Sequence, residues 1–444
     1  MTTTETDSRR LRLGTRGSRL ALTQSGQVAE ALMAAGGGGA AAAAGKASEG
    51  SGGLGIDLVT VRTDGDGDRT PLRQLGGAGV FAARLRHALL DGEVDLVVHS
   101  FKDLPTQPVE GLEVICVPAR EDPRDALCAR DGLTLADLPE GARVGTGSPR
   151  RAAQLLAARP DLEVVDLRGN VPTRLARVRG LEAVGVGTDE PVAPSRADAA
   201  GDLDAVVLAL SGLRRLGLEH CASEVLDLET MLPAPAQGAL AVEARAGEDS
   251  AELARAAAAL DDEPTRLAVT AERALMARLG AGCAAPVGAW AHLRGGDQEP
   301  WEDHAEHGTG WNEGFRGDDT AVTGSRQEAG AANGGPRPVV AADRGDDRGG
   351  TEPAGAAEPH GSAASCRSPR VLVLRAVVTS LDGGQEVGCE LSTELPETSG
   401  GPGTPGDTAA VRAAEALGVR AAEVLLDDGA EQIVDLHANK PRRD

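Results

Sequence analysis

The stretch GTGSPRRAAQLL, residues 145–156, passes from strand to helix within a few positions. A short strand is predicted at 143–145, just before it. Ser148 followed by Pro149 is typical of a helix start, because serine caps the first turn and proline needs no hydrogen-bond partner there. Helical spacing then predicts a helix over 149–158. A strand that turns through glycine into a helix is the repeating unit of an α/β fold.

The same alternation of strand and helix continues on both sides of this stretch. Further strands are predicted at residues 11–14, 56–63, 95–100, 112–117, 125–130, 162–167 and 204–210, and further helices at 18–35, 79–90 and 171–178. The continuous apolar run in DLVVHS, the third of these strands, is typical of a strand buried on both faces of a parallel sheet. These elements predict doubly wound α/β sheets.

The pattern changes after residue 239. Helices are predicted at 250–260, 264–279 and 408–426, and strands at 286–293, 371–379, 387–392 and 432–436. Strands that follow one another without crossover helices favour an antiparallel sheet, here covered by helices on one side. We therefore expect a third, smaller α+β unit at the end of the chain.

Four segments have a composition that does not support packing. Residues 36–53 and 184–201 are low-complexity linkers rich in Gly and Ala, and 396–407 is a shorter loop. The longest segment, 295–368, carries 14 acids and 6 Arg with no Leu or Ile, and this composition predicts disorder. Its two histidines, in HAEH, have no scaffold to hold a metal, so no metal site is expected.

The composition also restricts the class of protein. The chain of 444 residues exceeds one typical hydrophobic core, and its net charge of −23 would repel nucleic acid and anionic membranes. The first thirty residues carry no apolar run that could serve as a signal peptide, so none is expected, and no stretch reaches about 18 uninterrupted apolar residues. Its six cysteines lack the spacing of zinc ligands or of a disulfide framework. We expect a cytoplasmic enzyme or binding protein without a nucleic-acid or membrane partner.

Arginines concentrate at three predicted strand-to-helix turns. Residues 141–179 hold eight Arg against three acids, although the whole chain is acidic. The first turn contributes Thr146, Ser148, Arg150 and Arg151, the second Arg168 and Arg174, and the third Arg214 and Arg215. Because the carboxyl ends of parallel strands meet at one edge of a sheet, these turns together predict a pocket for a polyanion. Any one of these arginines alone could equally be a solvated surface residue.

Two further turns belong to the first part of the chain. In RLGTRGSRLALTQS, a glycine turn follows a strand, and it contains Arg16 and the predicted helix cap Ser18. In VHSFKDLPT, an apolar strand ends in Lys102 and Asp103. Asp103 is either a cap of the turn or, in a cleft lined by cations, the one carboxylate able to hold a developing positive charge or transfer a proton.

Six motifs together resemble one family. In chain order they are HSFKDLP from His99, REDPRDAL from Arg120, GTGSPRR from Gly145, LRGNVPTRL from Leu167, LPAPAQGALAVE from Leu232 and TAERALMARLGAGCAAPVGA from Thr270. In this order they closely resemble the porphobilinogen deaminases, also called hydroxymethylbilane synthases. The resemblance covers nearly all of the chain outside the four unpacked segments.

The resemblance implies two domains similar to periplasmic solute-binding proteins and a third domain that carries an attachment cysteine. On this basis we expect domain 1 at residues 1–118 with 239–258, domain 2 at 122–235 and domain 3 at 261–444. It also implies a transferase of tetrapyrrole and haem biosynthesis, which joins four porphobilinogen units head to tail, releases ammonia and yields hydroxymethylbilane. A monomer is implied as well.

The resemblance further assigns roles to individual residues. Asp103 matches the catalytic carboxylate, and Cys283 matches the cysteine that holds the dipyrromethane cofactor, itself two porphobilinogen units, through a thioether. Cofactor-binding positions are matched by Lys102, Thr146, Ser148, Arg150, Arg151, Arg174 and Arg215, and substrate-binding positions by Arg16, Ser18 and Arg168. The small residues around Cys283 in GAGCAAPVG leave room for a bulky pyrrole. Two positions depart from the family pattern, since Ala78 stands where Lys is frequent and Gly147 where Ser is frequent.

Two other functions are compatible with parts of the pattern. A non-catalytic, two-lobed anion-binding protein would use the same cleft without Asp103 or Cys283. A cysteine acyltransferase would need a base near Cys283, usually His, and no histidine of the folded segments is in a recognisable pairing with it. By spacing alone, a Cys among Gly and Ala is more often a packed structural thiol, so its assignment as an anchor depends on the resemblance.

Overall fold

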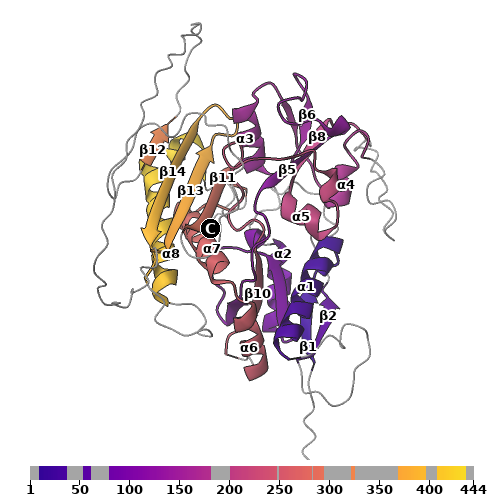
Figure 1. The fold of residues 1–444 in the computed structure, drawn as a ribbon, viewed down its shortest axis with the longest axis vertical. Coiled ribbons are helices and arrows are strands. Elements are labelled where there is room, and N and C mark those ends of the chain that lie inside the picture. Colours follow the sequence, from indigo (N-terminus) through magenta and orange to yellow (C-terminus); the bar gives the residue numbers. More distant parts are fainter. Residues whose placement is uncertain are drawn as a thin grey trace, which may run out of the picture.

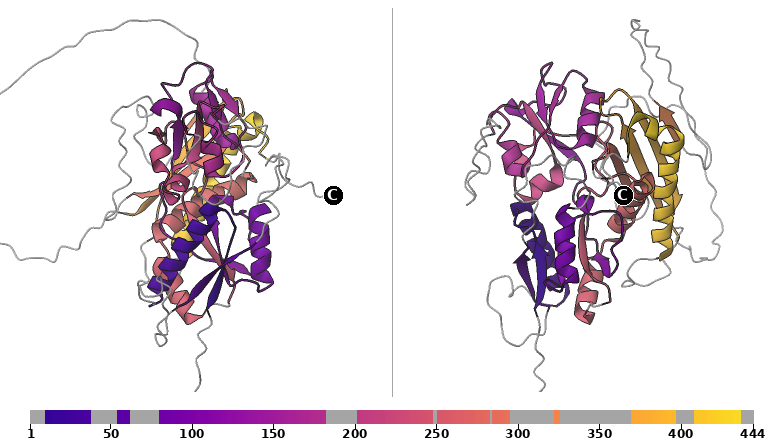
Figure 2. Two further views of the ribbon diagram at one scale, coloured as in Figure 1. Left: turned by 90° about the vertical axis from the view of Figure 1, so that its right-hand side faces the viewer. Right: turned by 180° about the vertical axis from the view of Figure 1, so that it is seen from behind.

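The computed structural model describes residues 10–37, 54–61, 80–181, 201–247, 250–282, 284–294, 322–325, 369–396 and 408–436. Within these ranges the chain forms three β-sheets, each with its own helices (Figure 1). Two mixed sheets belong to two lobes, named lobe 1 and lobe 2, and an antiparallel sheet belongs to domain 3. Figures 1 and 2 show lobe 2 above lobe 1, with domain 3 alongside both.

Lobe 1 is built on a five-stranded sheet in the order β2-β1-β3-β10-β4. Its elements are β1 (Leu11–Thr15), α1 (Arg19–Ala35), β2 (Ile56–Thr60), α2 (Val80–Leu90), β3 (Leu96–Ser100), the 3₁₀ turn η3 (Phe101–Asp103), β4 (Leu112–Cys116), β10 (Leu240–Arg245) and α6 (Ala251–Leu260). Successive side chains of β3 point to opposite faces, so that Val98 packs with α1 and α6 whereas Val97 packs with α2. The sheet therefore lies between two layers of helices.

Lobe 2 repeats this plan in the order β7-β6-β8-β5-β9. Its elements are β5 (Asp125–Ala129), the 3₁₀ turn η4 (Arg130–Gly132), β6 (Arg143–Gly145), α3 (Pro149–Ala158), β7 (Glu163–Val165), α4 (Val171–Leu175), β8 (Ala205–Ala209), α5 (Leu210–Arg215), the 3₁₀ turn η5 (Glu219–Cys221) and β9 (Glu224–Val225). In β8, Val206 packs with α4 and α5, and Val207 packs with α3. Residues 117–124 and 226–239 cross between the two lobes.

Domain 3 is an antiparallel sheet in the order β11-β13-β14-β12. Its elements are α7 (Glu263–Leu279), β11 (Val287–Arg294), β12 (Val322–Ser325), β13 (Val371–Thr379), β14 (Glu386–Glu394), α8 (Thr408–Asp427) and α9 (Ala430–Ile433). Helices α7 and α8 cover one face with a core of Leu, Val and Ala. They approach closely at Gly418, where a Cβ would overlap the carbonyl oxygen of Ala271. On the other face Trp290 and Val377 pack against Leu232 beside lobe 2.

The predicted fold class is confirmed in its two α/β lobes and its small α+β domain. The helix predicted at 149–158 begins and ends at those residues. The sequence pattern misses β10, because Glu243 interrupts its apolar run and is buried in an ion pair with Arg86. Since β10 is antiparallel to both neighbours, and β5 is antiparallel to β8, the sheets are mixed instead of purely parallel.

Two other predictions are wrong in part or in full. The strand predicted at 432–436 is absent from the described chain, where Gly429, with a φ of 95°, precedes the short helix α9 instead. The prediction of disorder for 295–368 is contradicted at β12, which pairs with β14 at the edge of the sheet. Such an edge strand is held by backbone hydrogen bonds, which composition does not reveal.

Several predictions fall on residues that the structure does not describe. These are the rest of the 295–368 insert with its two histidines, and most of the segments predicted as linkers at 36–53, 184–201 and 396–407. The domain boundaries stay a prediction. Among the described helices, none combines the length and the apolar character needed to cross a membrane.

Candidate active site

Three parallel strands of lobe 2 end at the same edge of their sheet. Strand β6 pairs in parallel with both β7 and β8, so the turns that follow them lie on one side, as predicted. After β6, the Ser148 amide donates to Thr146 Oγ1 at 3.2 Å, and the Arg151 amide donates to Ser148 Oγ at 3.5 Å. Gly147 packs closely in this turn, since a Cβ there would overlap the carbonyl oxygen of Leu167 unless the backbone shifted.

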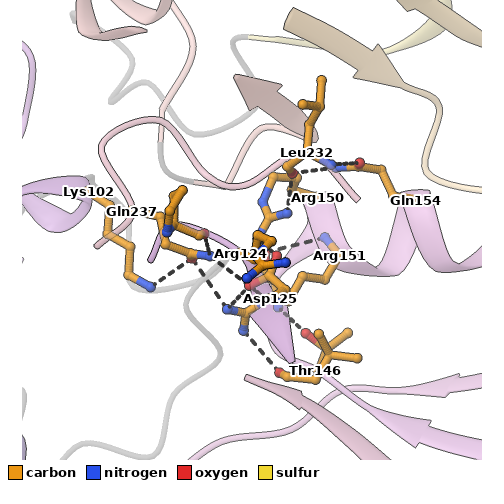
Figure 3. Close-up of polar contacts among 12 residues, drawn as sticks. Lys102, Arg124, Asp125, Thr146, Arg150, Arg151, Gln154, Leu232 and Gln237 are labelled. Atoms are coloured by element: carbon orange, nitrogen blue, oxygen red, sulfur yellow. Dashed lines mark hydrogen bonds and ion pairs between the residues drawn. The ribbon is translucent and has the colours of Figure 1, made fainter. Parts of the chain in front are cut away.

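Asp125 fixes the two arginines of α3. Its completely buried carboxylate accepts from Arg150 Nη2 at 2.7 Å and from Arg151 Nε and Nη2 at 3.0 and 2.7 Å (Figure 3). Arg151 also donates to the Val207 carbonyl oxygen at 3.0 Å. Burial alone would raise the pKa of Asp125, but the charges of Arg150 and Arg151 outweigh burial and lower that pKa. The carboxylate is therefore ionised and holds both guanidinium groups near the end of β6.

Gln237 connects lobe 1 to this pair of arginines. It lies fully buried on the second crossover segment, and its Nε2 atom donates to Asp125 Oδ1 at 2.8 Å. Its Oε1 atom accepts from Lys102 Nζ at 3.2 Å and from Arg151 Nη2 at 3.4 Å (Figure 3). Burial lowers the pKa of Lys102 to about 8, although the neighbouring charge of Asp103 opposes this shift. Lys102 thus begins to lose its positive charge at mildly alkaline pH.

Asp103 is close to cations of both lobes. It ends η3 directly after β3, and its side chain is exposed. Its negative charge raises the pKa of Lys102 in lobe 1 and that of Arg174, on α4 of lobe 2. Burial, followed by repulsion from Arg151 and Arg168, nevertheless lowers the pKa of Arg174 to about 10. Because no residue in the described part of the chain hydrogen-bonds the Asp103 carboxylate, this group is open to a ligand.

The turn after β1 lies beside η3, because β1 and β3 are parallel neighbours in the sheet. This turn carries Arg16, which is partly buried, and Ser18, whose side chain caps α1. Gln24 of α1 donates to Ser100 Oγ, at the end of β3, at 3.1 Å. The two predicted sites of lobe 1 therefore share one edge of its sheet.

Arg215 is placed differently from the other predicted arginines. It donates to the carbonyl oxygen of Gly238 at 2.7 Å and, with Arg120 and Glu121, lines a cavity of about 470 Å³ beside the crossover segments. Burial lowers its pKa, and the charge of Glu121 opposes this. Within the described ranges, Arg215 makes no hydrogen bond or ion pair with the group around Asp125.

The predicted anchor Cys283 lies outside the described residues, as does Ala78. The chain on both sides of Cys283 is described. Gly280 ends α7 in the left-handed conformation with a φ of 63°, and the Ala285 amide donates to the Gly282 carbonyl oxygen at 2.9 Å. The segment that enters the anchor position therefore follows directly from α7.

Two residues of the site are absent from the sequence prediction, Asp125 and Gln237. Both lie in motifs that the sequence singles out, REDPRDAL and LPAPAQGALAVE. Asp125 is a carboxylate at the start of the otherwise apolar strand DALCA. A buried carboxylate needs a cation close to it, so its presence in this strand is a sequence feature that indicates Asp125 as a paired residue. Gln237 gives no comparable signal, because a neutral amide is common in loops and its partners are distant in sequence.

The donors gathered here fit a ligand with several carboxylates. The cations near Asp103 and Asp125 are Lys102, Arg150, Arg151, Arg168 and Arg174. Two buried donors, Arg150 Nε and Arg168 Nη2, have no hydrogen-bond partner among the described residues, and buried donors of this kind normally have one. The acetate and propionate groups of a dipyrromethane are suitable acceptors. The described residues include no group of His, Cys, Asp or Glu able to hold a metal ion.

Two family models and two curated relatives that match this chain carry the same family name. The family described as porphobilinogen deaminase, dipyromethane cofactor binding domain, matches residues 11–253, and that described as porphobilinogen deaminase, C-terminal domain, matches residues 266–299. The porphobilinogen deaminase of Micrococcus luteus is 56% identical over 300 residues, covering 65% of this chain and 74% of that protein. That of Cutibacterium acnes is 44% identical over 434 residues, covering 98% of this chain and 99% of that protein. A solved lipoprotein of the YaeC family from Enterococcus faecalis V583 is 16% identical, covers 57% of this chain and 92% of its own, and has a TM-score of 0.29.

Proposed function

The chain belongs to the porphobilinogen deaminase family, and from this premise we propose which residues carry out the family's reaction. The protein is a transferase of tetrapyrrole biosynthesis, a hydroxymethylbilane synthase that joins four porphobilinogen units head to tail and releases ammonia. The observation that carries the proposed roles is the position of Asp103 near Lys102 of lobe 1 and Arg174 of lobe 2.

We assign the carboxylate-binding role to cations of both lobes. Lys102, Thr146, Ser148, Arg150, Arg151 and Arg174 bind the cofactor, Arg16, Ser18 and Arg168 bind the substrate, and Arg215 contributes from the crossover side. Each pyrrole carries two carboxylates, and each charge-assisted hydrogen bond contributes about 1.5–3 kcal/mol. When bound through Cys283, the dipyrromethane would supply the pyrrole carbon to which units are added. Asp125 keeps Arg150 and Arg151 in place for this ligand.

Asp103 is the catalytic carboxylate in this proposal. When ammonia leaves porphobilinogen, positive charge spreads onto the pyrrole nitrogen of the substrate. The Asp103 carboxylate stabilises that charge and can hold the proton of the nitrogen, because none of the described residues hydrogen-bonds it. The surrounding cations bind the substrate carboxylates and so keep the pyrrole nitrogen facing Asp103.

We further propose that the protein acts as a cytoplasmic monomer. Cys128, Cys221 and Cys389 are buried free thiols in the structure. Free thiols are typical of a reducing compartment, which supports the proposed location. Sedimentation of the purified protein at micromolar concentration tests the monomer, and a dimer would contradict it.

Replacement of Asp103 by Asn tests its assigned role. We expect Asp103→Asn to lower kcat by about 10²–10³-fold, because the charge that stabilises the reacting nitrogen is removed. Since Asp103 is exposed, the variant should unfold at the same urea concentration as the parent protein. Asp137→Asn, at an exposed carboxylate of lobe 2, is the matched control and should keep its full rate. Undiminished turnover by Asp103→Asn would remove Asp103 from this role.

A further inference from the structure

Arg273 of α7 is bound to the turn that carries Asp103. Its Nη1 atom donates to the carbonyl oxygen of Leu104 at 2.7 Å and to that of Phe101 at 3.3 Å. Its Nη2 atom donates to the carbonyl oxygen of Pro105 at 2.7 Å. The guanidinium group also lies over the Phe101 ring, 4.5 Å from the ring centre. One side chain of domain 3 therefore contacts the backbone on both sides of Asp103.

These contacts determine where the Asp103 carboxylate lies. The turn η3 is a single 3₁₀ turn, closed by the Leu104 amide, which donates to the Phe101 carbonyl oxygen at 3.2 Å. Hydrogen bonds of such turns have poorer geometry than those of an α-helix. The Asp103 side chain has no hydrogen-bond partner in the described ranges, so its position follows that of the backbone. From outside the turn, the Phe101 amide donates to the Ala239 carbonyl oxygen at 3.0 Å, and Arg273 holds the carbonyl oxygens of the turn and of the residues that follow it.

The same helix leads to the predicted anchor. Arg273 lies six residues before Leu279, the last residue of α7, which corresponds to about 9 Å along the helix axis. The neighbouring residue Glu272 is completely buried and accepts from Arg120 Nη1 and Nη2 at 2.7 and 3.1 Å. Helix α7 is thus attached to a crossover segment through Glu272 and to η3 through Arg273, and it then enters the segment of Cys283.

We propose, on the basis of the role proposed above for Asp103, that Arg273 is a positioning residue for the reaction. It holds η3 against α7, so the Asp103 carboxylate keeps one place relative to the helix that enters the Cys283 segment. The planar fork of arginine suits this task because it reaches several carbonyl oxygens and the Phe101 ring at once. A lysine presents one compact charge and cannot make all of these contacts.

Arg273→Met keeps an unbranched apolar side chain and removes every donor. We expect its kcat to fall by about 10- to 100-fold, because a displacement of about 1 Å at a reacting group can cost this much. Its KM should change little, since Arg150 and Arg151, which bind the carboxylates, are held by Asp125 on lobe 2. Arg273→Lys should be intermediate in kcat. A raised KM with unchanged kcat in Arg273→Met would overturn the positioning role.

Arg278→Met is the matched control on the same helix. Arg278 is about half exposed and pairs with Glu423 at 3.3 Å, so this variant should keep the parent kcat. Intact mass of the purified proteins should show the cofactor attached in all three variants. If Arg273→Met lacked the cofactor, Arg273 would act in attachment instead, and the positioning role would be overturned.

A double substitution separates this inference from the proposed role of Asp103. Single-turnover addition of one porphobilinogen unit, followed by intact mass, gives the rate for Asp103→Asn with and without Arg273→Met. If Arg273 acts through Asp103, the double variant adds the unit no more slowly than Asp103→Asn alone. If the two substitutions act independently, their rate losses multiply in the double variant, and that result would overturn the inference. A parent rate in Asp103→Asn would instead contradict the role of Asp103. A slow Asp103→Asn together with a parent rate in Arg273→Met would contradict only the role of Arg273.

Discussion

Removal of the buried charge of Asp125 should destabilise the protein more than any surface substitution. Asp125→Asn leaves the Arg150 and Arg151 guanidinium groups buried, whereas in the parent protein each donates a 2.7 Å hydrogen bond to this one carboxylate. Breaking a buried pair by removing one partner costs about 3–5 kcal/mol. A single pair at about 4 Å is worth about 4 kcal/mol at an effective dielectric constant of about 20, which agrees with this range. We therefore expect the free energy of unfolding to fall by about 3–5 kcal/mol.

Urea unfolding followed by far-ultraviolet circular dichroism measures this loss. Asp57→Asn is the control, because the Arg10–Asp57 pair is about half exposed on each side and such pairs contribute about 0–1 kcal/mol. Since the folded-state pKa of Asp125 is lowered, its contribution is fully present above its unfolded pKa of about 3.9 and is lost as pH falls toward the folded value. The difference between Asp125→Asn and the parent protein should therefore shrink only in acid. Equal midpoints for Asp125→Asn and Asp57→Asn at neutral pH would refute this reasoning.

Three further outcomes are expected. Lys102→Arg should keep its activity to higher pH than the parent, because burial lowers the pKa of Lys102 to about 8 and the lysine loses its charge as pH rises through that value. If kcat/KM of the variant and of the parent fell at the same alkaline pH, this expectation would be contradicted. Glu272→Gln should lower the free energy of unfolding in urea by about 3–5 kcal/mol, because it leaves the buried Arg120 without its counter-charge, and an unchanged midpoint would speak against that cost. Gly383→Ala should lower the free energy of unfolding by about 1–3 kcal/mol, since Gly383 has a φ of 74° and a Cβ would overlap the Ala157 backbone of α3. If this variant unfolded at the same urea concentration as the parent, the hairpin of domain 3 that contains Gly383 would not be held against lobe 2.

Local patterns predict the parts of the site that depend on a strand, a turn and a helix start. The turn after β6 is one case, because Ser148 and Pro149 determine where α3 begins, and α3 carries Arg150 and Arg151. The meeting of Thr146 and Arg168 at one edge follows from the parallel direction of β6 and β7. These features are encoded within about twenty residues of each other.

Long-range contacts account for what the sequence does not predict. Gln237 bonds Asp125 across 112 residues and Lys102 across 135 residues, and no local pattern records either pairing. Strand β10 is missed for a similar reason, since its buried Glu243 is stabilised by Arg86 from a distant helix. Arg215 follows a strand of the same edge, yet it binds the Gly238 carbonyl oxygen on the crossover side, because the direction of its side chain depends on packing between the lobes.

The proposed chemistry depends most directly on the covalent state of Cys283, which intact mass measures. Intact-mass spectrometry should find the native protein heavier by two linked pyrroles and a Cys283→Ser variant without that adduct. A native protein that carries a bare thiol at Cys283, after expression with porphobilinogen available, would contradict the proposal that an oligopyrrole grows from this sulfur among the cations around Asp103.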